Sequence, residues 1–131
     1  MLIYLDTVIV IYAIEGAPIF QSRAVARLAL ANATGDHLVT SHLTRLECLV
    51  QPIRRNDINL LTEYSKFLGK TFVLPLPPLV YDRAAQIRAL NNYPIADALH
   101  LATAIAGNCD LFLTNDARLA GFSDIAVEIL P

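Results

Sequence analysis

The sequence predicts an α/β protein in which a parallel sheet is covered by helices on both faces. Short apolar runs typical of buried strands alternate along the chain with segments whose apolar residues recur at helical spacing. The chain has 131 residues, of which 55% are hydrophobic and 17% are charged. This size and composition fit one compact domain over residues 1–131 and argue against disorder. The composition leaves more apolar surface than a monomer of this size normally buries, so we expect a homodimer or another partner.

The first part of the chain is expected to form two strands and three helices. Gly16 and Pro18 end the first helix, and Ser41 is a suitable N-cap for the third, which Pro52 discourages from continuing. The expected elements are a strand at 2–5, helices at 8–15 and 19–33, a strand at 38–40 and a helix at 42–51. The inward stripe of the third helix is expected to consist of Leu43, Leu46 and Val50.

The second part of the chain continues the alternation. Asn56 or Asp57 can cap the next helix and Gly69 closes it, while Pro94 suits the first turn of a later helix that ends at Gly107. The expected elements are a helix ending at 68, a strand at 71–74, helices at 79–90 and 94–106, a strand at 111–113, a short helix ending near 121 and an edge strand at 125–129. The helix over 94–106 is apolar nearly all round, so we expect it in the interior.

Four acidic residues that are far apart in the sequence lie in or beside these apolar segments: Asp6, Glu47, Asp97 and Asp116. A buried carboxylate without a partner shifts its pKa or binds a cation, so the set suggests a shared metal. Asp6 and Asp116 directly follow predicted strands, where ligand sites of open α/β sheets form. Glu47 and Asp97 lie early in helices, near amino-terminal ends at the same edge. Asp110 precedes its strand and is expected at the opposite edge.

Carboxylate oxygens are hard ligands that favour Mg²⁺ or Mn²⁺. Such an ion lowers the pKa of a water molecule and offsets negative charge on a phosphate, which indicates hydrolysis of a phosphodiester. The formal net charge of −2 weakens a nucleic-acid hypothesis without removing it, because an acidic cluster masks basic contacts elsewhere. Candidates for contacts to an RNA backbone are Arg23, Arg27, Arg54, Arg55 and Arg118.

Four short segments carry a family resemblance that spans the chain. They are Tyr4-Leu5-Asp6-Thr7, Thr44-Arg45-Leu46-Glu47, Asp97-Ala98-Leu99-His100-Leu101-Ala102-Thr103-Ala104 and Leu113-Thr114-Asn115-Asp116. In this order and spacing they resemble the PIN-domain proteins, specifically the small VapC toxins of prokaryotic toxin–antitoxin pairs. The resemblance implies a three-layer α/β/α fold with a parallel sheet of about five strands in the order 3-2-1-4-5.

The resemblance also implies a function. It predicts a metal-dependent endoribonuclease that needs Mg²⁺ or Mn²⁺, forms a homodimer, and is inhibited by a cognate antitoxin protein that occupies the site. The implied catalytic metal ligands are Asp6, Glu47, Asp97 and Asp116. Two residues after the first acid the family often has Asn, Ser or Thr, whereas this chain has Val8, so a hydrogen bond to a ligand is missing unless Thr7 supplies it. Thr114 and Asn115 are secondary candidates for orienting ligands or contacting phosphate.

Other functions were weighed against the same residues. A response-regulator receiver domain needs paired acids after its first strand and a lysine after a late strand, and a haloacid-dehalogenase-type phosphatase needs a second Asp where Val8 stands; both are excluded. A catalytically inactive PIN-like binding module remains as the alternative function. His100, three residues after Asp97, is expected to be a core histidine rather than a metal ligand.

The apolar amino terminus lacks a basic leader and is interrupted by Asp6, so we expect neither secretion nor contact with a membrane. Cys48 and Cys109 have no metal-type spacing and are expected to be reduced thiols of a cytoplasmic protein.

Overall fold

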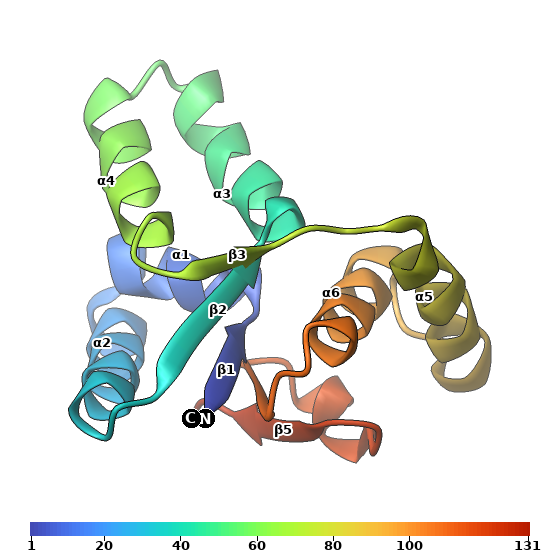
Figure 1. Cartoon of the computed structure of the whole chain (residues 1–131). Helices are drawn as coiled ribbons and strands as arrows, with labels where there is room; N and C mark the ends of the chain where they lie inside the picture. Colours follow the sequence, from blue (N-terminus) through green and yellow to red (C-terminus); the bar gives the residue numbers. More distant parts are fainter.

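The computed structural model describes residues 1–131 and contains one sheet of five parallel strands (Figure 1). The strand order is β3-β2-β1-β4-β5, which confirms the predicted order. The strands are β1 Leu2–Leu5, β2 His37–Ser41, β3 Phe72–Leu74, β4 Leu111–Thr114 and β5 Ala126–Ile129. In the register of the central strands, Ile3 pairs with Leu38 of β2 and Leu111 of β4.

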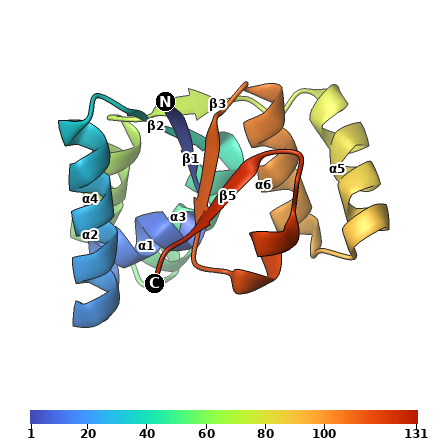
Figure 2. The ribbon, with the colours of Figure 1, turned by 90° about the horizontal axis from the view of Figure 1, so that it is seen from below.

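Helices cover both faces of this sheet, as the predicted three-layer architecture requires (Figures 1 and 2). They are α1 Thr7–Glu15, α2 Pro18–Ala33, α3 His42–Arg54, α4 Ile58–Leu68, α5 Pro78–Asn91, α6 Ile95–Ala106 and the short 3₁₀ helix η1 Ala117–Gly121. In β1, Ile3 and Leu5 pack into a core with α1 to α4, whereas Tyr4 packs into a second core with α5, α6 and η1. The two cores follow from strand geometry, in which successive side chains point to opposite faces.

The predicted ends of most elements agree with the structure to within a residue or two. The Ser41 side chain accepts a hydrogen bond from the backbone N–H of Thr44, and the Asp57 side chain accepts one from Leu60, so both cap their helices as expected. Gly69 and Gly107 follow the last residues of α4 and α6. The α6 helix lies in the interior, with Leu101 fully buried. The local capping chemistry therefore determines where these helices begin and end.

The predictions for α3 were wrong in two respects. The helix continues through Pro52 to Arg54, so the proline lies in its last turn and did not end it. Its buried residues are Thr44, Cys48 and Pro52, which are four residues apart and therefore share one face of the helix.

The residues predicted to face inward in α3 do not lie in the core. Leu43 is only partly buried, Leu46 is 62% exposed and Val50 is 38% exposed. Packing against the sheet selects the other face, because the buried Cys48 lies in the same core as Ile3 and Leu5 of β1.

No single helix is long and apolar enough to cross a membrane. The pair α1 and α2 meets that test of length and composition only when taken together, and it is bent by 113°. Both cysteines are free, as predicted; Cys48 is buried and Cys109 is partly exposed.

Candidate functional site

A cleft of about 500 Å³ contains all four acidic residues selected from the sequence. Its lining consists of Asp6, Thr7, Val8, Glu47, Asp97, Asn115, Asp116 and Ala117. These residues come from the ends of β1 and β4, from the starts of α1 and η1 that follow them, and from α3 and α6, so the cleft lies at the carboxyl edge of the sheet. The carboxylate of Asp110 instead accepts a hydrogen bond from the backbone of Leu2 at 2.7 Å, at the start of β1 and the opposite edge.

Asp6 is held on both of its carboxylate oxygens. It caps α1, because Oδ1 accepts a hydrogen bond from the backbone N–H of Thr7 at 2.8 Å. Oδ2 accepts a hydrogen bond from the Thr114 hydroxyl at 2.7 Å, and the Asp6 backbone N–H donates to the carbonyl of Leu113 at 2.9 Å. The junction of β1 and α1 is thereby tied to the end of β4. The Asp6 side chain therefore both caps α1 and lines the cleft.

Glu47 is anchored by two side chains from other elements. The Thr7 hydroxyl donates to Oε1 at 2.8 Å, and Nε2 of His100 lies 2.5 Å from the same oxygen. Burial opposes ionisation of Glu47, but the hydrogen bonds from His100 and Thr7 place its pKa below the ordinary value. His100 is 1% exposed, as expected for a core histidine. Its contact with Glu47 was not predicted.

Asp97 is the third residue of α6, and its carboxylate is repelled by the other acids of the cleft. Burial raises the pKa of Asp97, and the negative charges of Asp6 and Asp116 raise it further. The nearest compensating charge is Arg118, whose Nη2 lies 3.4 Å from Asp97 Oδ2. A cation that entered the cleft would relieve this repulsion.

Asp116 caps η1 and is paired with Arg118 two residues later. The guanidinium contacts both carboxylate oxygens, with Nε 3.0 Å from Oδ1 and Nη2 2.5 Å from Oδ2. This pairing lowers the pKa of Asp116. Among the other arginines considered for RNA contacts, Arg27 binds Glu128 at 2.6 Å and Arg55 lies 3.7 Å from Glu15. Three of the five candidate arginines therefore have acidic partners within the chain.

The residues of the cleft fit a hard divalent cation by donor type. All four acids offer carboxylate oxygens, which Mg²⁺ and Mn²⁺ prefer. No three acidic, histidine or cysteine side chains are spaced as a preassembled ion site. Arg118 occupies both carboxylate oxygens of Asp116, so an ion that used all four acids would require the Arg118 side chain to move. Their assignment as metal ligands stays a prediction.

The secondary candidates divide into two kinds. Thr7 and Thr114 donate to Glu47 and Asp6 and so orient acids of the cleft. Asn115 lines the cleft, but its Oδ1 accepts from the Tyr12 hydroxyl at 3.1 Å and its Nδ2 donates to the carbonyl of Leu130 at 3.0 Å. Asn115 therefore ties the cleft to α1 and to the chain just beyond β5.

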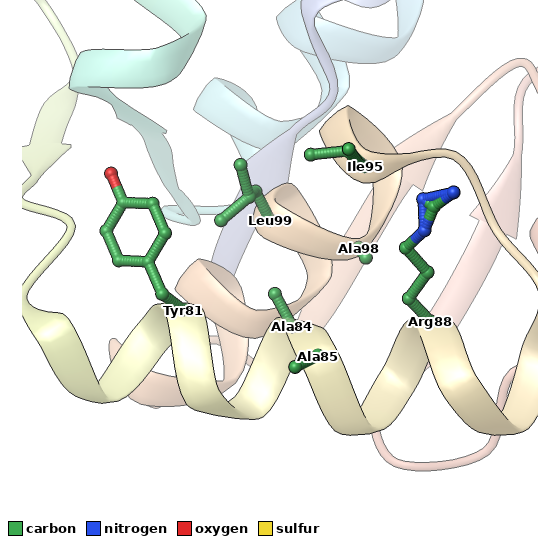
Figure 3. A pocket seen from close by; sticks show the side chains of 7 residues that line it. All are labelled: Tyr81, Ala84, Ala85, Arg88, Ile95, Ala98 and Leu99. Atoms are coloured by element: carbon green, nitrogen blue, oxygen red, sulfur yellow. The ribbon is translucent and has the colours of Figure 1, made fainter.

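A second hollow, of about 250 Å³, lies between α5 and α6 and has a different character (Figure 3). Tyr81 and Arg88 of α5 face Ile95 and Leu99 of α6, and small alanines line the remainder. It contains no acidic residue and shares no lining residue with the acidic cleft. The four acids selected from the sequence therefore belong to the acidic cleft and not to this hollow.

The chain belongs to the PIN domain family, because the family model for the PIN domain matches residues 3–127. Among curated protein sequences, none matches this chain.

Several solved structures share the fold. A VapBC2 structure from Rickettsia felis, bound to a DNA fragment from its promoter, is 18% identical with a TM-score of 0.82, and the match covers 100% of both chains. A DNA-bound VapBC from Salmonella typhimurium is 19% identical with a TM-score of 0.78 and the same full coverage. VapC20 of Mycobacterium tuberculosis, a sarcin–ricin loop cleaving toxin, is 16% identical with a TM-score of 0.73, over 95% of this chain and 98% of that one.

Proposed function

We propose that this protein is a metal-dependent endoribonuclease that hydrolyses RNA phosphodiester bonds with Mg²⁺ or Mn²⁺. The observation that carries the proposal is the convergence of Asp6, Glu47, Asp97 and Asp116 on one cleft at the carboxyl edge of a PIN-domain sheet. These four residues are the proposed catalytic metal ligands.

The chain's own groups have separate roles in this proposal. Asp6 and Asp116 provide negative charge from the N-caps of α1 and η1, and Glu47 and Asp97 provide it from α3 and α6. Thr7 and Thr114 keep two of these carboxylates oriented. A bound divalent ion would lower the pKa of a water molecule and offset charge on the phosphate. In the reaction, the oxygen of water bonds to phosphorus, one P–O ester bond breaks, and the leaving oxygen receives a proton.

RNA cleavage with the purified protein tests this function. Wild-type protein is expected to cut RNA when Mg²⁺ or Mn²⁺ is added and to stop when the ion is chelated. Asp97→Asn should lower the rate at least about 100-fold, because one charged ligand is lost with little change in volume. Asp82→Asn is the matched control, since Asp82 is exposed on α5 and does not line the cleft. Equal rates for the wild type and Asp97→Asn would refute the assignment of Asp97.

We further propose that the protein is the toxin of a VapBC-type pair, acts in the cytoplasm and is inhibited by a cognate antitoxin. The support is the shared fold with VapBC structures from Rickettsia felis and Salmonella typhimurium. Expression in a bacterial host should arrest growth, and Asp97→Asn should relieve the arrest. A short neighbouring gene for a DNA-binding protein should also relieve it when co-expressed. Growth unaffected by the active wild-type protein would contradict the toxin assignment.

The alternative function is a catalytically inactive PIN-like binding module. It is favoured by Val8, which brings an apolar side chain to the cleft, and by Arg118, which pairs with Asp116. Inactivity of antitoxin-free protein on varied RNAs, with both metals supplied, would select this alternative.

We also propose that residues 1–131 are one domain and that it forms a homodimer. The two cores share one sheet, which supports a single folding unit. Large apolar side chains that are more than half exposed support a dimer; they include Leu46, Ile53, Ile58, Leu79, Leu90 and Ile95. Light scattering at micromolar concentration should give twice the mass of one chain, and a single-chain mass would contradict the dimer.

A further inference from the structure

A buried hydrogen-bond chain ends at Glu47 and passes through His100. The imidazole is 1% exposed and has a side-chain partner on each nitrogen. Nδ1 lies 2.7 Å from the Tyr4 hydroxyl, and Nε2 lies 2.5 Å from Glu47 Oε1 and 3.2 Å from the Thr7 hydroxyl. The Tyr4 hydroxyl is in turn 2.8 Å from the Ser41 hydroxyl. Side chains from β1, β2, α6 and α3 are therefore joined in one chain of contacts.

The chemistry of the groups fixes the direction of donation along this hydrogen-bond chain. An ionised Glu47 only accepts hydrogen bonds, so Nε2 of His100 carries the proton that it donates to Oε1. In the neutral imidazole the other nitrogen is an acceptor, and the Tyr4 hydroxyl donates to it. Burial raises the pKa of the Tyr4 phenol well above its ordinary value, which keeps that donor protonated. The Ser41 hydroxyl then donates to the Tyr4 oxygen.

Tyr4 and His100, in the middle of the hydrogen-bond chain, are held rigidly by packing. Tyr4 is fully buried and its ring stacks on Phe112 with a centroid separation of 5.4 Å. The same ring meets the imidazole of His100 edge-on, with centroids 5.7 Å apart. The other two histidines of the chain, His37 and His42, are exposed. Only His100 is therefore placed to control an acid of the cleft.

Both donors to Glu47 bind the same oxygen. Thr7 and His100 contact Oε1, which leaves Oε2 available for a ligand in the cleft. We infer that His100 is a positioning residue, held by Tyr4, that fixes the Glu47 carboxylate so that Oε2 is presented to a divalent cation. This inference rests on the proposed function, because it assigns a role to His100 and Tyr4 at the same site. Neither residue contacts the cation or the RNA.

The first experiment measures binding of Mn²⁺ alone by isothermal titration calorimetry. Tyr4→Phe removes the donor to Nδ1 while it keeps the ring that stacks on Phe112. Its Mn²⁺ affinity should fall about 10-fold, the lower end of what loss of such a supporting hydrogen bond costs. Tyr93→Phe is the matched control, because Tyr93 packs beside the same core but lies outside the chain of contacts, and its affinity should equal that of the wild type. Unchanged affinity in Tyr4→Phe would overturn the inference.

The second experiment reads the proton on the imidazole in metal-free wild-type protein and needs no variant. The ¹⁵N chemical shifts of His100 should show a proton on Nε2 and none on Nδ1. A proton on Nδ1 alone would overturn the inference and leave the proposed nuclease untouched. If wild-type protein neither binds Mn²⁺ nor cleaves RNA, both the proposed function and the positioning role are overturned. If the wild type cleaves RNA normally and Tyr4→Phe binds Mn²⁺ as tightly as the wild type, only the positioning role is overturned.

Discussion

The guanidinium of Arg118 binds the carboxylate of Asp116 through three hydrogen bonds, from Nε at 3.0 and 3.1 Å and from Nη2 at 2.5 Å. The same Nη2 lies 3.4 Å from Asp97. A positive charge of the chain itself is therefore placed against two of the four acids of the cleft. The Arg118 side chain is 65% exposed, so water and salt weaken its hold on them.

Arg118→Gln is predicted to strengthen divalent-cation binding. The substitution removes a competitor for Asp116 and a positive charge near Asp97, and both effects favour an incoming cation. The gain in Mn²⁺ affinity should be roughly twofold to fivefold, as expected for an exposed ion pair. Calorimetric titration measures it, with Arg88→Gln on the exposed surface of α5 as the control. Weaker binding by Arg118→Gln would show that the guanidinium supports the site rather than competing for it.

Asp97→Asn is predicted to stabilise the metal-free fold at neutral pH. Burial and the charges of Asp6 and Asp116 raise the pKa of Asp97 in the folded protein. An acid whose pKa is raised by folding contributes stability that is fully present below its unfolded pKa, near 4, and is lost as the pH rises through the folded pKa. The ionised group is therefore unfavourable at pH 7.

The expected gain for Asp97→Asn is about 1–3 °C in the melting midpoint at pH 7, because partial exposure screens the effect. Thermal unfolding in the presence of a chelator measures it, and the difference should vanish near pH 3. A melting midpoint for Asp97→Asn below that of the wild type at pH 7 would contradict the repulsion described here.

The orientation of α3 is tested by truncating Leu46, with Leu101 of α6 as the buried reference. Leu101→Ala should lower the free energy of unfolding by about 2–5 kcal/mol, because it leaves a cavity in a fully buried part of α6. Leu46→Ala should change it by less than about 0.5 kcal/mol, because the Leu46 side chain is 62% exposed. Urea unfolding measures both values. A large loss at Leu46 would indicate either that α3 is turned as its sequence suggested or that Leu46 is buried in a dimer, and the mass of the protein separates these two cases.

Both cysteines are predicted to react slowly with alkylating reagents in the folded protein. Burial raises the pKa of the Cys48 thiol to about 12 and that of Cys109 to about 11, so little thiolate is present at pH 8. Mass spectrometry after brief treatment with iodoacetamide should find both unmodified, whereas protein unfolded in urea should carry two modifications. Rapid labelling of Cys48 in the native state would contradict its burial in α3.

Most of the fold could be predicted because the signals that specify it are local. Apolar runs such as Leu2–Leu5, stops such as Gly69 and caps such as Asp57 act on their immediate neighbours, and the structure retains them. The rotation of α3 could not be predicted in this way. Helical periodicity states which residues share a face, but α3 has apolar residues on more than one side, and contacts with the sheet select the buried side.

The same distinction applies to the site. By itself the sequence determined the alternation of strands and helices, and with it the edge of the sheet where Asp6 and Asp116 follow their strands. Only the tertiary structure decided that His100 meets Glu47, a residue 53 positions earlier, and that Tyr4 supports His100 across 96 positions. The physical reason is that a hydrogen bond depends on separations of about 3 Å in space, which local spacing along the chain does not encode.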